Sequence, residues 1–252
     1  MNQIEKANHF ASLHIAGSPL VLYNIWDAGS AKTITDSGAA AVATGSWSVA
    51  AAHGFDDGEK IPMSLLFEVV RRIAESVDVP LSVDFEGGYS TDPDAAAENI
   101  RQLIATGAIG INIEDQIVGG QGLHSIVDQA NRIRAIRKAA EQANVPLFIN
   151  SRTDLFLKSD ATQHQGHVDE ALERATAYAE AGASGFFVPG LTQSALIERV
   201  CLNTGLPVNV MMRGELKKIS DVAPLGVSRA SFGPGPYIEA MSDLAGKFKA
   251  LN

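Results

Sequence analysis

Two carboxylates lie two residues apart in the stretch VPLSVDFEGGYS, where Asp84 and Glu86 follow a short aliphatic run and precede two glycines. Side chains two apart on a strand point to the same side, so both acids are expected to face one site. Glu114 closes a second aliphatic run, in INIED. Acids that meet in one place repel each other unless a cation is present, and ligands made only of oxygen favour a hard ion. The pattern therefore predicts a Mg²⁺ site, with Mn²⁺ as the alternative ion.

The strands that must position these acids recur along the chain. Three runs begin at a proline, in DVPLSVD, NVPLFINSR and GLPVNVMMR, and proline is tolerated at the first position of a strand. Four more runs follow glycines placed where a helix would end in a left-handed cap, namely Gly38, Gly107, Gly182 and Gly226. With the run from Pro19, the sequence predicts eight strands, starting near 19, 39, 80, 108, 146, 183, 207 and 226.

Helical patterns separate these strands. MSLLFEVVRRIAESV repeats apolar residues at helical spacing, and DPDAAAENIRQLIATG opens with Asp92 as a cap and Pro93 at the first helical position. Alternating strands and helices over this length favour a parallel (β/α)₈ barrel, in one domain that spans residues 1–252. An open, doubly wound sheet is the competing arrangement.

In a barrel of this kind, the active site forms at the C-terminal ends of the strands. Two neighbouring predicted strands end in the acids described above, and the next strand ends in Arg152. The alternative is that the acids only cap helices or pair with Arg152 and other bases, but their convergence on one mouth favours a metal site. The other polar residues and glycines at predicted strand ends are Asn24, Asp27, Thr44, Gly45, Ser46, Asn112, Asn150, Asn209, Arg213, Ser228 and Ser231.

Composition excludes several classes of protein. The chain carries 20 Lys and Arg against 29 Asp and Glu, a formal charge of −9, with no basic cluster, so neither nucleic acid nor an anionic membrane is an expected partner. Its single cysteine, Cys201, excludes an internal disulfide framework and a cysteine-based zinc site. No secretory signal pattern is seen, and no segment approaches the ~18 apolar residues of a spanning helix. A cytoplasmic location is expected.

Several motifs together resemble the isocitrate lyase and phosphoenolpyruvate mutase family. DFEGGY is similar to the family's D-x-[DE]-x-G-Y metal motif, INIEDQ to the strand end that follows it, and NSRTDLFL to its arginine strand. GSWSVAAAHGFDDGE resembles the family's G-S-x-x-S…G-x-x-D loop, and YNIWDAGSA its opening strand and turn. These matches keep the family's order from about residue 20 to 160, and GFFVPG, LPVNVMM and SRASFG are similar to its 2-oxo acid lyase branch.

The resemblance implies a ligand set for the metal. Asp84 would be the principal ligand. Glu86, Glu114 and Asp57 would hold the waters of the ion or reach the ion themselves. Asp57 is also counted among the expected catalytic residues, together with Arg152.

The resemblance also implies substrate contacts. Backbone N–H groups of Gly45, Ser46 and Trp47 would bind a substrate carboxylate, as backbone donors do in other anion sites. Arg152 would bind that carboxylate or the oxygen that becomes charged. Asn209 lies on a late strand where related lyases place polar contacts to the substrate.

A loop over residues 117–127 departs from the family. Lyases of the isocitrate type carry K-[KR]-C-G-H here, and mutases and phosphonopyruvate hydrolases carry a lysine, whereas this chain reads QIVGGQGLHSIVD from Gln116. Its glycines suit a mobile lid that excludes water. His124 is the loop's one side chain with a pKa near neutral, so it is the expected proton donor, with an exposed histidine of no role as the alternative.

The sequence thus predicts a Mg²⁺-dependent carbon–carbon lyase that acts on a small 2-oxo or 2-hydroxy acid, through an enolate or oxyanion stabilised by the metal and Arg152. The alternatives are phosphorus–carbon chemistry on phosphonopyruvate, as a mutase or hydrolase, and decarboxylation of an oxaloacetate-type acid. A metabolite-binding barrel without activity is a further alternative. GPGPY, ending at Tyr237, precedes a last helix that relatives pack on or swap with a neighbouring subunit, so a homo-oligomer, dimer or tetramer, is expected.

Overall fold

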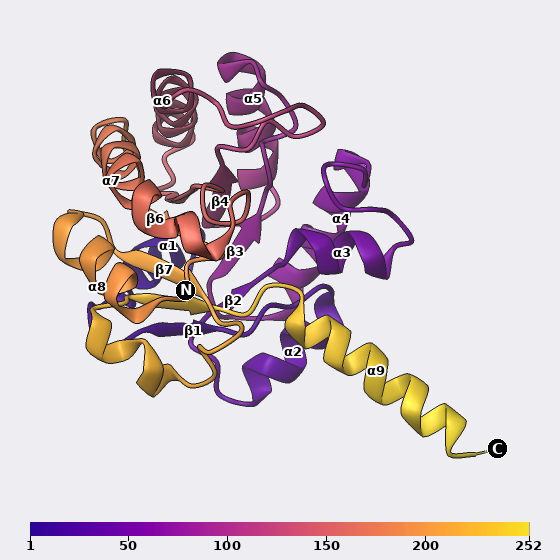
Figure 1. Ribbon diagram of the computed structural model, residues 1–252. Helices are drawn as coiled ribbons and strands as arrows, with labels where there is room; N and C mark the ends of the chain where they lie inside the picture. The colour runs from indigo at the N-terminus through magenta and orange to yellow at the C-terminus, as the bar shows by residue number, and fades with distance from the viewer. Residues whose placement is uncertain (252) are drawn as a thin grey trace.

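The computed structural model describes residues 1–251 and shows a ring of parallel strands surrounded by helices (Figure 1). The strands are β1 (Leu20–Leu22), β2 (Val42–Ala43), β3 (Leu81–Asp84), β4 (Gly110–Glu114), β5 (Phe148–Arg152), β6 (Gly185–Phe187), β7 (Val208–Met211) and β8 (Arg229–Ser231). Each strand from β2 to β7 pairs in parallel with the next strand in the sequence, and β8 pairs with β1.

The ring closes between β1 and β2 through a short bridge rather than a full ladder. Ile25 and Thr44 form a parallel bridge just beyond the two strands. The Ile25 N–H donates to the Ala43 carbonyl at 2.9 Å, and the Gly45 N–H donates to the Ile25 carbonyl at 3.2 Å. The predicted (β/α)₈ barrel is therefore confirmed, and the doubly wound open sheet is excluded.

The helices that surround the ring bury one apolar stripe each. In α4, Leu66, Val69, Val70 and Ile73 are buried, at the spacing that one face of a helix requires. The helices are α1 (Gln3–Ser12), α2 (Ala28–Asp36), α3 (Ser46–Ala52), α4 (Met63–Ser76), α5 (Pro93–Ile104), α6 (Ile126–Gln142), α7 (His164–Glu180), α8 (Ser194–Asn203) and α9 (Gly235–Lys249). Short 3₁₀ turns span Ala161–Gln163, Ile219–Asp221 and Ala223–Leu225.

Local signals in the sequence place the element ends correctly. Asp92 caps α5 by accepting from the Ala95 N–H at 2.8 Å, with Pro93 at the first helical position. The four glycines predicted as left-handed caps have φ between 86° and 103°. Each strand begins one to three residues after its predicted start, as β2 does at residue 42 against 39.

The N-terminal end of the ring is closed by α1. Phe10 is fully buried and packs edge-on against Phe148, with 5.3 Å between ring centroids. His14 stacks on Phe148 at 4.0 Å. Burial, with the nearby charge of Arg229, lowers the pKa of His14 to about 3, so this imidazole is neutral. We call Phe10, His14, Phe148 and the apolar residues packed around Phe10 the barrel floor.

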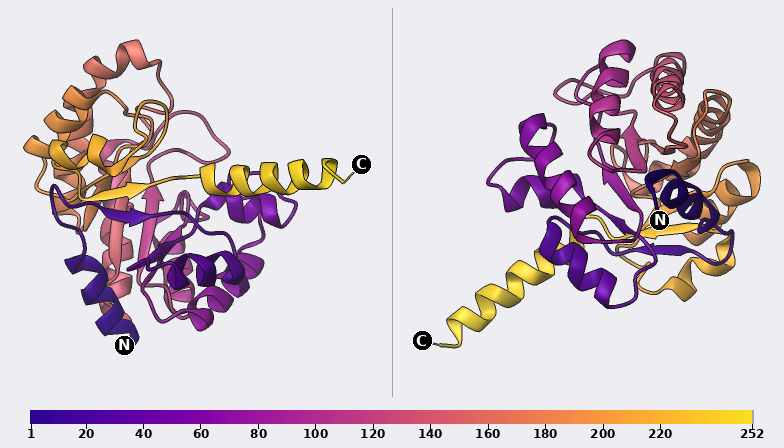
Figure 2. Two further views of the ribbon diagram at one scale, coloured as in Figure 1. Left: turned by 90° about the horizontal axis from the view of Figure 1, so that it is seen from below. Right: turned by 180° about the vertical axis from the view of Figure 1, so that it is seen from behind.

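The last helix, α9, projects away from the barrel (Figure 2). Pro236 is its only buried residue within the described chain. Its exposed apolar side chains include Ile238, Met241, Leu244 and Phe248. Among the helices of residues 1–251, none combines the length and the apolar character needed to cross a bilayer.

Candidate active site

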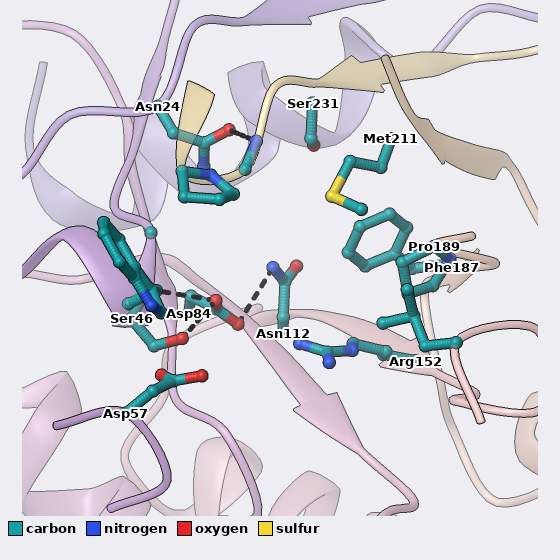
Figure 3. A pocket seen from close by; sticks show the side chains of 15 residues that line it. Asn24, Ser46, Asp57, Asp84, Asn112, Arg152, Phe187, Pro189, Met211 and Ser231 are labelled. Carbon is teal, nitrogen blue, oxygen red and sulfur yellow. Dashed lines mark hydrogen bonds between the residues drawn. The ribbon is translucent and has the colours of Figure 1, made fainter. Parts of the chain in front are cut away.

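A cavity of about 170 Å³ opens at the C-terminal ends of the strands, the mouth of the barrel (Figure 3). It has room for several waters, which suits a short organic acid. Its lining comes from nearly every strand end: Asn24, Gly45, Ser46, Trp47, Asp57, Asp84, Asn112, Arg152, Leu157, Phe187, Pro189, Met211, Ser231, Gly233 and Pro234.

Asp84 is held in the cavity by three donors. Its Oδ2 accepts from the backbone N–H of Ser46 at 3.1 Å and from the Ser46 hydroxyl at 2.8 Å. Its Oδ1 accepts from Asn112 Nδ2 at 3.3 Å. Asp84 closes β3, and Ser46 opens α3 just after β2, so the parallel pairing of β2 with β3 brings these two residues together.

Asp57 lies at the rim of the same cavity. Partial burial and the charge of Asp84 raise its pKa, which shows that the two carboxylates repel each other. Within residues 1–251, no three acidic, histidine or cysteine side chains converge closely enough to hold a metal ion unaided. Mg²⁺, however, binds through one or two carboxylates and keeps several waters. The pair Asp84 and Asp57 is therefore a donor set that fits Mg²⁺ with a partial water shell.

Glu86 does not share this cavity. The strand ends at Asp84, and Glu86 adopts φ +48°, a left-handed conformation, so strand alternation no longer sets its direction. Its Oε2 accepts from the backbone N–H of Glu59 at 2.7 Å. Burial raises the pKa of Glu86 to about 8, with the charges of Asp84 and Asp57 acting in the same direction. The expectation that Glu86 faces the same site as Asp84 by strand geometry was therefore wrong.

Arg152 enters the cavity from β5 between two carboxylates. Its Nε and Nη2 donate to Asp154 at 2.6 and 2.9 Å, and its Nη1 lies 2.9 Å from Glu114 Oε2. Burial opposes the charge of Arg152, but the two acids outweigh it and raise its pKa. Burial raises the pKa of Glu114 well above its usual value, although Arg152 counteracts this. Glu114 thus positions the guanidinium and is not among the residues that line the cavity.

Below the cavity, Arg229 supports Asn112. Arg229 Nη2 donates to Asn112 Oδ1 at 3.2 Å, and Asn150 Nδ2 donates to the same oxygen at 2.9 Å. Two donors on Oδ1 turn the amide so that Nδ2 points to Asp84. Arg229 is buried, its Nη1 has no hydrogen-bond partner, and no ion pair within residues 1–251 includes it. Sequence reasoning placed Asn112 at a strand end without giving it a role, and it did not select Arg229 or Asp154. SRASFG nevertheless places a charge inside a strand that otherwise carries only small and apolar residues.

Some of the residues predicted to contact the substrate line the cavity, and one does not. Gly45, Ser46 and Trp47 line the cavity, but the N–H of Gly45 donates to Ile25 and that of Ser46 to Asp84. Asn209 is buried in the barrel, where its Oδ1 accepts from the Ser231 hydroxyl at 3.1 Å. Asn209 is therefore one layer below the lining residues.

His124 lies in a different cavity, of about 210 Å³, together with Glu59, Tyr89 and Arg132. Burial, and then the charge of Arg132, lower its pKa. Its N–H donates to the Asp115 carbonyl at 2.7 Å, and its own carbonyl accepts from Arg174 at 3.0 Å. The structure therefore does not bring His124 together with the residues around Asp84.

The predicted lid is a short hairpin in this structure. Gln116 and Leu123 form an antiparallel bridge, and the Ile117 N–H donates to the Gly122 carbonyl at 3.1 Å. Val118, near the hairpin tip, packs beside Gly87. A Cβ on residue 87 would lie only 2.9 Å from Val118 Cγ2. Residues 126–127 of the predicted loop belong to the first turn of α6.

Together, these contacts place an oriented carboxylate and an arginine on one small cavity. Such a pair can hold a cation and an anionic substrate, and it can stabilise negative charge that develops between them.

Comparison with known proteins gives a family context. The family described as phosphoenolpyruvate phosphomutase matches residues 10–252. A protein of Mycobacterium tuberculosis, named only as uncharacterized, is 32% identical over 243 residues, which cover 96% of this chain and 88% of that protein. The 2-methylisocitrate lyase of Escherichia coli is 30% identical over 143 residues, 55% of this chain and 46% of that enzyme. An oxaloacetate decarboxylase of Bradyrhizobium is 27% identical over 214 residues, 82% of this chain and 71% of that enzyme.

Solved structures agree with the fold. A provisionally named phosphonomutase of Burkholderia cenocepacia J2315 superposes with a TM-score of 0.97 at 47% identity, over 100% of both chains. Phosphonopyruvate hydrolase, solved with oxalate and Mg²⁺, has a TM-score of 0.87 at 20% identity, over 100% of this chain and 87% of that one. At 20% identity the second likeness shows the fold alone.

Proposed function

The chain belongs to the phosphoenolpyruvate phosphomutase family, within the superfamily of isocitrate lyase, and from this we propose that it is a Mg²⁺-dependent enzyme that cleaves a carbon–carbon bond in a small 2-oxo or 2-hydroxy acid. The observation that carries the proposal is that Asp84 and Arg152, from β3 and β5, face one cavity of about 170 Å³. Mn²⁺ is the alternative ion, because the same oxygen donors suit it.

Each residue of the mouth has a role in this proposal. Asp84, with Asp57 beside it, would hold the cation, and Ser46 and Asn112 fix the orientation of Asp84. When bound, the cation supplies Lewis acidity to the carboxylate and C2 oxygen of the substrate.

Arg152 would stabilise the developing negative charge. A guanidinium has five N–H donors, and the contacts with Asp154 and Glu114 engage three of them, so donors remain for the substrate. The two acids also lock the side chain in place, so little reorganisation is needed during the reaction.

Phosphorus–carbon chemistry is the second candidate. It is favoured by the 47% identity, over the full length of both chains, to a protein provisionally named as a phosphonomutase. The two candidates differ in their products, because a phosphonate substrate yields free phosphate or a phosphoenol ester.

One experiment tests the proposal. The protein is incubated with Mg²⁺ and short 2-oxo, 2-hydroxy and phosphono acids, and products are followed by proton and phosphorus NMR. A new 2-oxo acid from a carbon-only substrate is expected, and EDTA and Asp84→Ala should both abolish its formation. Asp56→Ala, which removes a neighbouring exposed acid, should leave it unchanged. Turnover that survives EDTA would refute the metal-dependent mechanism.

The oligomeric state is a separate part of the proposal. The apolar side chains of α9 recur three or four residues apart and form one stripe, which we propose is covered by another copy of the chain, as a dimer or tetramer. Light scattering should give a multiple of 26.6 kDa for the wild type. The double substitution Leu244→Glu and Phe248→Glu should reduce that mass, and a wild-type monomer would contradict the proposal.

A further inference from the structure

Two connecting segments meet beside the cavity at the mouth of the barrel, and they bring together the two proposed ligands of the cation. Asp57 lies in the loop between α3 and α4, residues 53–62, and Asp84 is followed by the turn that leads into α5, residues 85–92. Both carboxylates line the cavity and lie near each other (Figure 3). Glu59, two residues after Asp57, lines the second cavity instead.

The backbone is strained where the loop meets the turn. Glu59, Glu86 and Tyr89 have φ values of 59°, 48° and 57°. Among the other residues 1–251, glycines apart, only Asn144 has a positive φ, and asparagine adopts this conformation more readily than most residues. A left-handed backbone is unfavourable for a residue with a Cβ, so it persists only where the surrounding contacts impose it. The strain in this chain is therefore concentrated at one junction beside the proposed cation site.

Glu59 holds the loop and the turn together in both directions. Its backbone N–H donates to Glu86 Oε2 at 2.7 Å. Its own Oε1 accepts from the backbone N–H of Tyr89, also at 2.7 Å. The loop therefore both donates to the turn and accepts from it, and these two hydrogen bonds fix the two backbones relative to each other.

The other side chains that hold the turn connect it to the outer helices. Arg132 in α6 donates to the Ser90 carbonyl at 2.8 Å, and Asn99 in α5 donates to the Gly88 carbonyl at 3.0 Å. Among the hydrogen bonds of residues 1–251, the two made by Glu59 are the ones that join the turn to the loop. Glu59 therefore has a function in the packing that its neighbours do not share.

We propose that Glu59 is a positioning residue for the cation, because it sets the separation between the carboxylates of Asp57 and Asp84. This inference rests on the proposed cation site and adds to it a residue that does not line the cavity. The two carboxylates repel each other, so without a link the loop and the turn would move apart. Mg²⁺ requires nearly ideal ligand geometry, and a link between the two segments keeps the carboxylates at a fixed distance before the ion arrives.

Mn²⁺ affinity tests this role without depending on turnover. Mn²⁺ is titrated into the protein, and the free ion is followed by electron paramagnetic resonance. Glu59→Gln keeps the size of the side chain but removes its charge and one acceptor oxygen, so it should weaken Mn²⁺ binding about tenfold or more. Asn99→Ala is the matched control, because it removes a hydrogen bond from the same turn but leaves the link to the loop. It should change Mn²⁺ affinity by less than about twofold.

A double-mutant cycle separates positioning from simple loss of charge. Glu59→Gln removes a negative charge near the ion, and a pure charge effect would multiply the loss of affinity in Asp57→Asn. Positioning acts through the carboxylate of Asp57, so in the Asp57→Asn background Glu59→Gln should cause less than about a twofold further loss. Losses that multiply in the double variant would overturn the proposal.

Glu59→Asp provides a second variant that keeps the charge. Its carboxylate is one methylene short of the Tyr89 N–H, so Mn²⁺ binding should again weaken, and wild-type affinity would overturn the proposal. Urea midpoints in EDTA should fall in both Glu59→Gln and Asn99→Ala, since each loses a hydrogen bond of the turn. Equal Mn²⁺ affinity in these two variants would therefore leave Glu59 a structural residue only.

The same titration distinguishes failure of this inference from failure of the proposed function. Wild-type protein that binds Mn²⁺, with unchanged affinity in Glu59→Gln, would overturn the role of Glu59 and leave the cation site intact. Wild-type protein that binds neither Mn²⁺ nor Mg²⁺ would overturn both this inference and the metal-dependent mechanism.

Discussion

The floor of the barrel is closed by apolar side chains around Phe10, whereas its mouth gathers acids whose pKa values burial raises, among them Glu86 and Glu114. Each end of the ring is formed by the same strands, so the difference lies in what the strand ends carry. The apolar side chains of the floor stabilise the fold because they are buried. The buried charges of the mouth destabilise it. Strain and unpaired charge of this kind collect at functional sites, where the fold compensates for them.

The floor should therefore show the largest effect on stability. Phe10→Ala removes a fully buried ring that contacts Phe148, and we expect the free energy of unfolding to fall by about 3–5 kcal/mol. Urea denaturation measures this change. Leu202→Ala, at a side chain that is 76% exposed, is the control and should change stability by less than about 0.5 kcal/mol. An equal loss in both variants would contradict the role of the floor.

The mouth should show the largest effect on turnover. Arg152→Ala is expected to reduce kcat by about 10² or more, the usual effect of losing one oriented donor to a developing charge. It should also lower stability, because Glu114 and Asp154 lose their partner. Arg152→Lys keeps the charge but not the two-pronged contact, so it should restore stability more than kcat. Full activity in Arg152→Ala would rule out its proposed role.

The contribution of Glu86 to the free energy of unfolding depends on pH. Its pKa is raised from 4.5 to about 8 in the folded, metal-free protein, so the folded state holds a proton that the unfolded state has lost between these values. Stability from this group is therefore complete below pH 4.5 and is lost as the pH rises toward 8, by up to about 1.4 kcal/mol per pH unit. Urea midpoints in EDTA from pH 5 to pH 8 measure this slope. Glu86→Gln should flatten it, and an unchanged slope would exclude Glu86 as its source.

The smallest expected effect on the free energy of unfolding is at Arg229, which lies between the floor and the mouth of the barrel. Because this buried guanidinium has no carboxylate partner, Arg229→Met should leave the free energy of unfolding within about 1 kcal/mol of wild type, or raise it. Asn112 would nevertheless lose one of the two donors that orient it toward Asp84, so Mn²⁺ affinity, followed by electron paramagnetic resonance, should fall. A loss of several kcal/mol with unchanged Mn²⁺ binding would make Arg229 a purely structural residue.

The amino-acid sequence by itself determined the barrel and the identity of its main polar contributors. Proline and glycine positions marked the strands to within three residues, because they act through local backbone geometry. Asp84 and Arg152 lie at the mouth as expected, since the C-terminal ends of parallel strands meet at one end of a barrel. The family resemblance, drawn from motifs between residues 20 and 160, was confirmed by a match over residues 10–252.

Only the tertiary structure decided how these side chains meet. Glu86 leaves the strand pattern because a left-handed turn follows β3, and His124 enters a second cavity because its backbone is held by Asp115 and Arg174. Arg229 reaches Asn112 across 117 residues of sequence, a contact that no local pattern encodes. Spacing along the chain fixes backbone direction over a few residues, whereas pairing and burial depend on strands and loops brought together by closure of the ring.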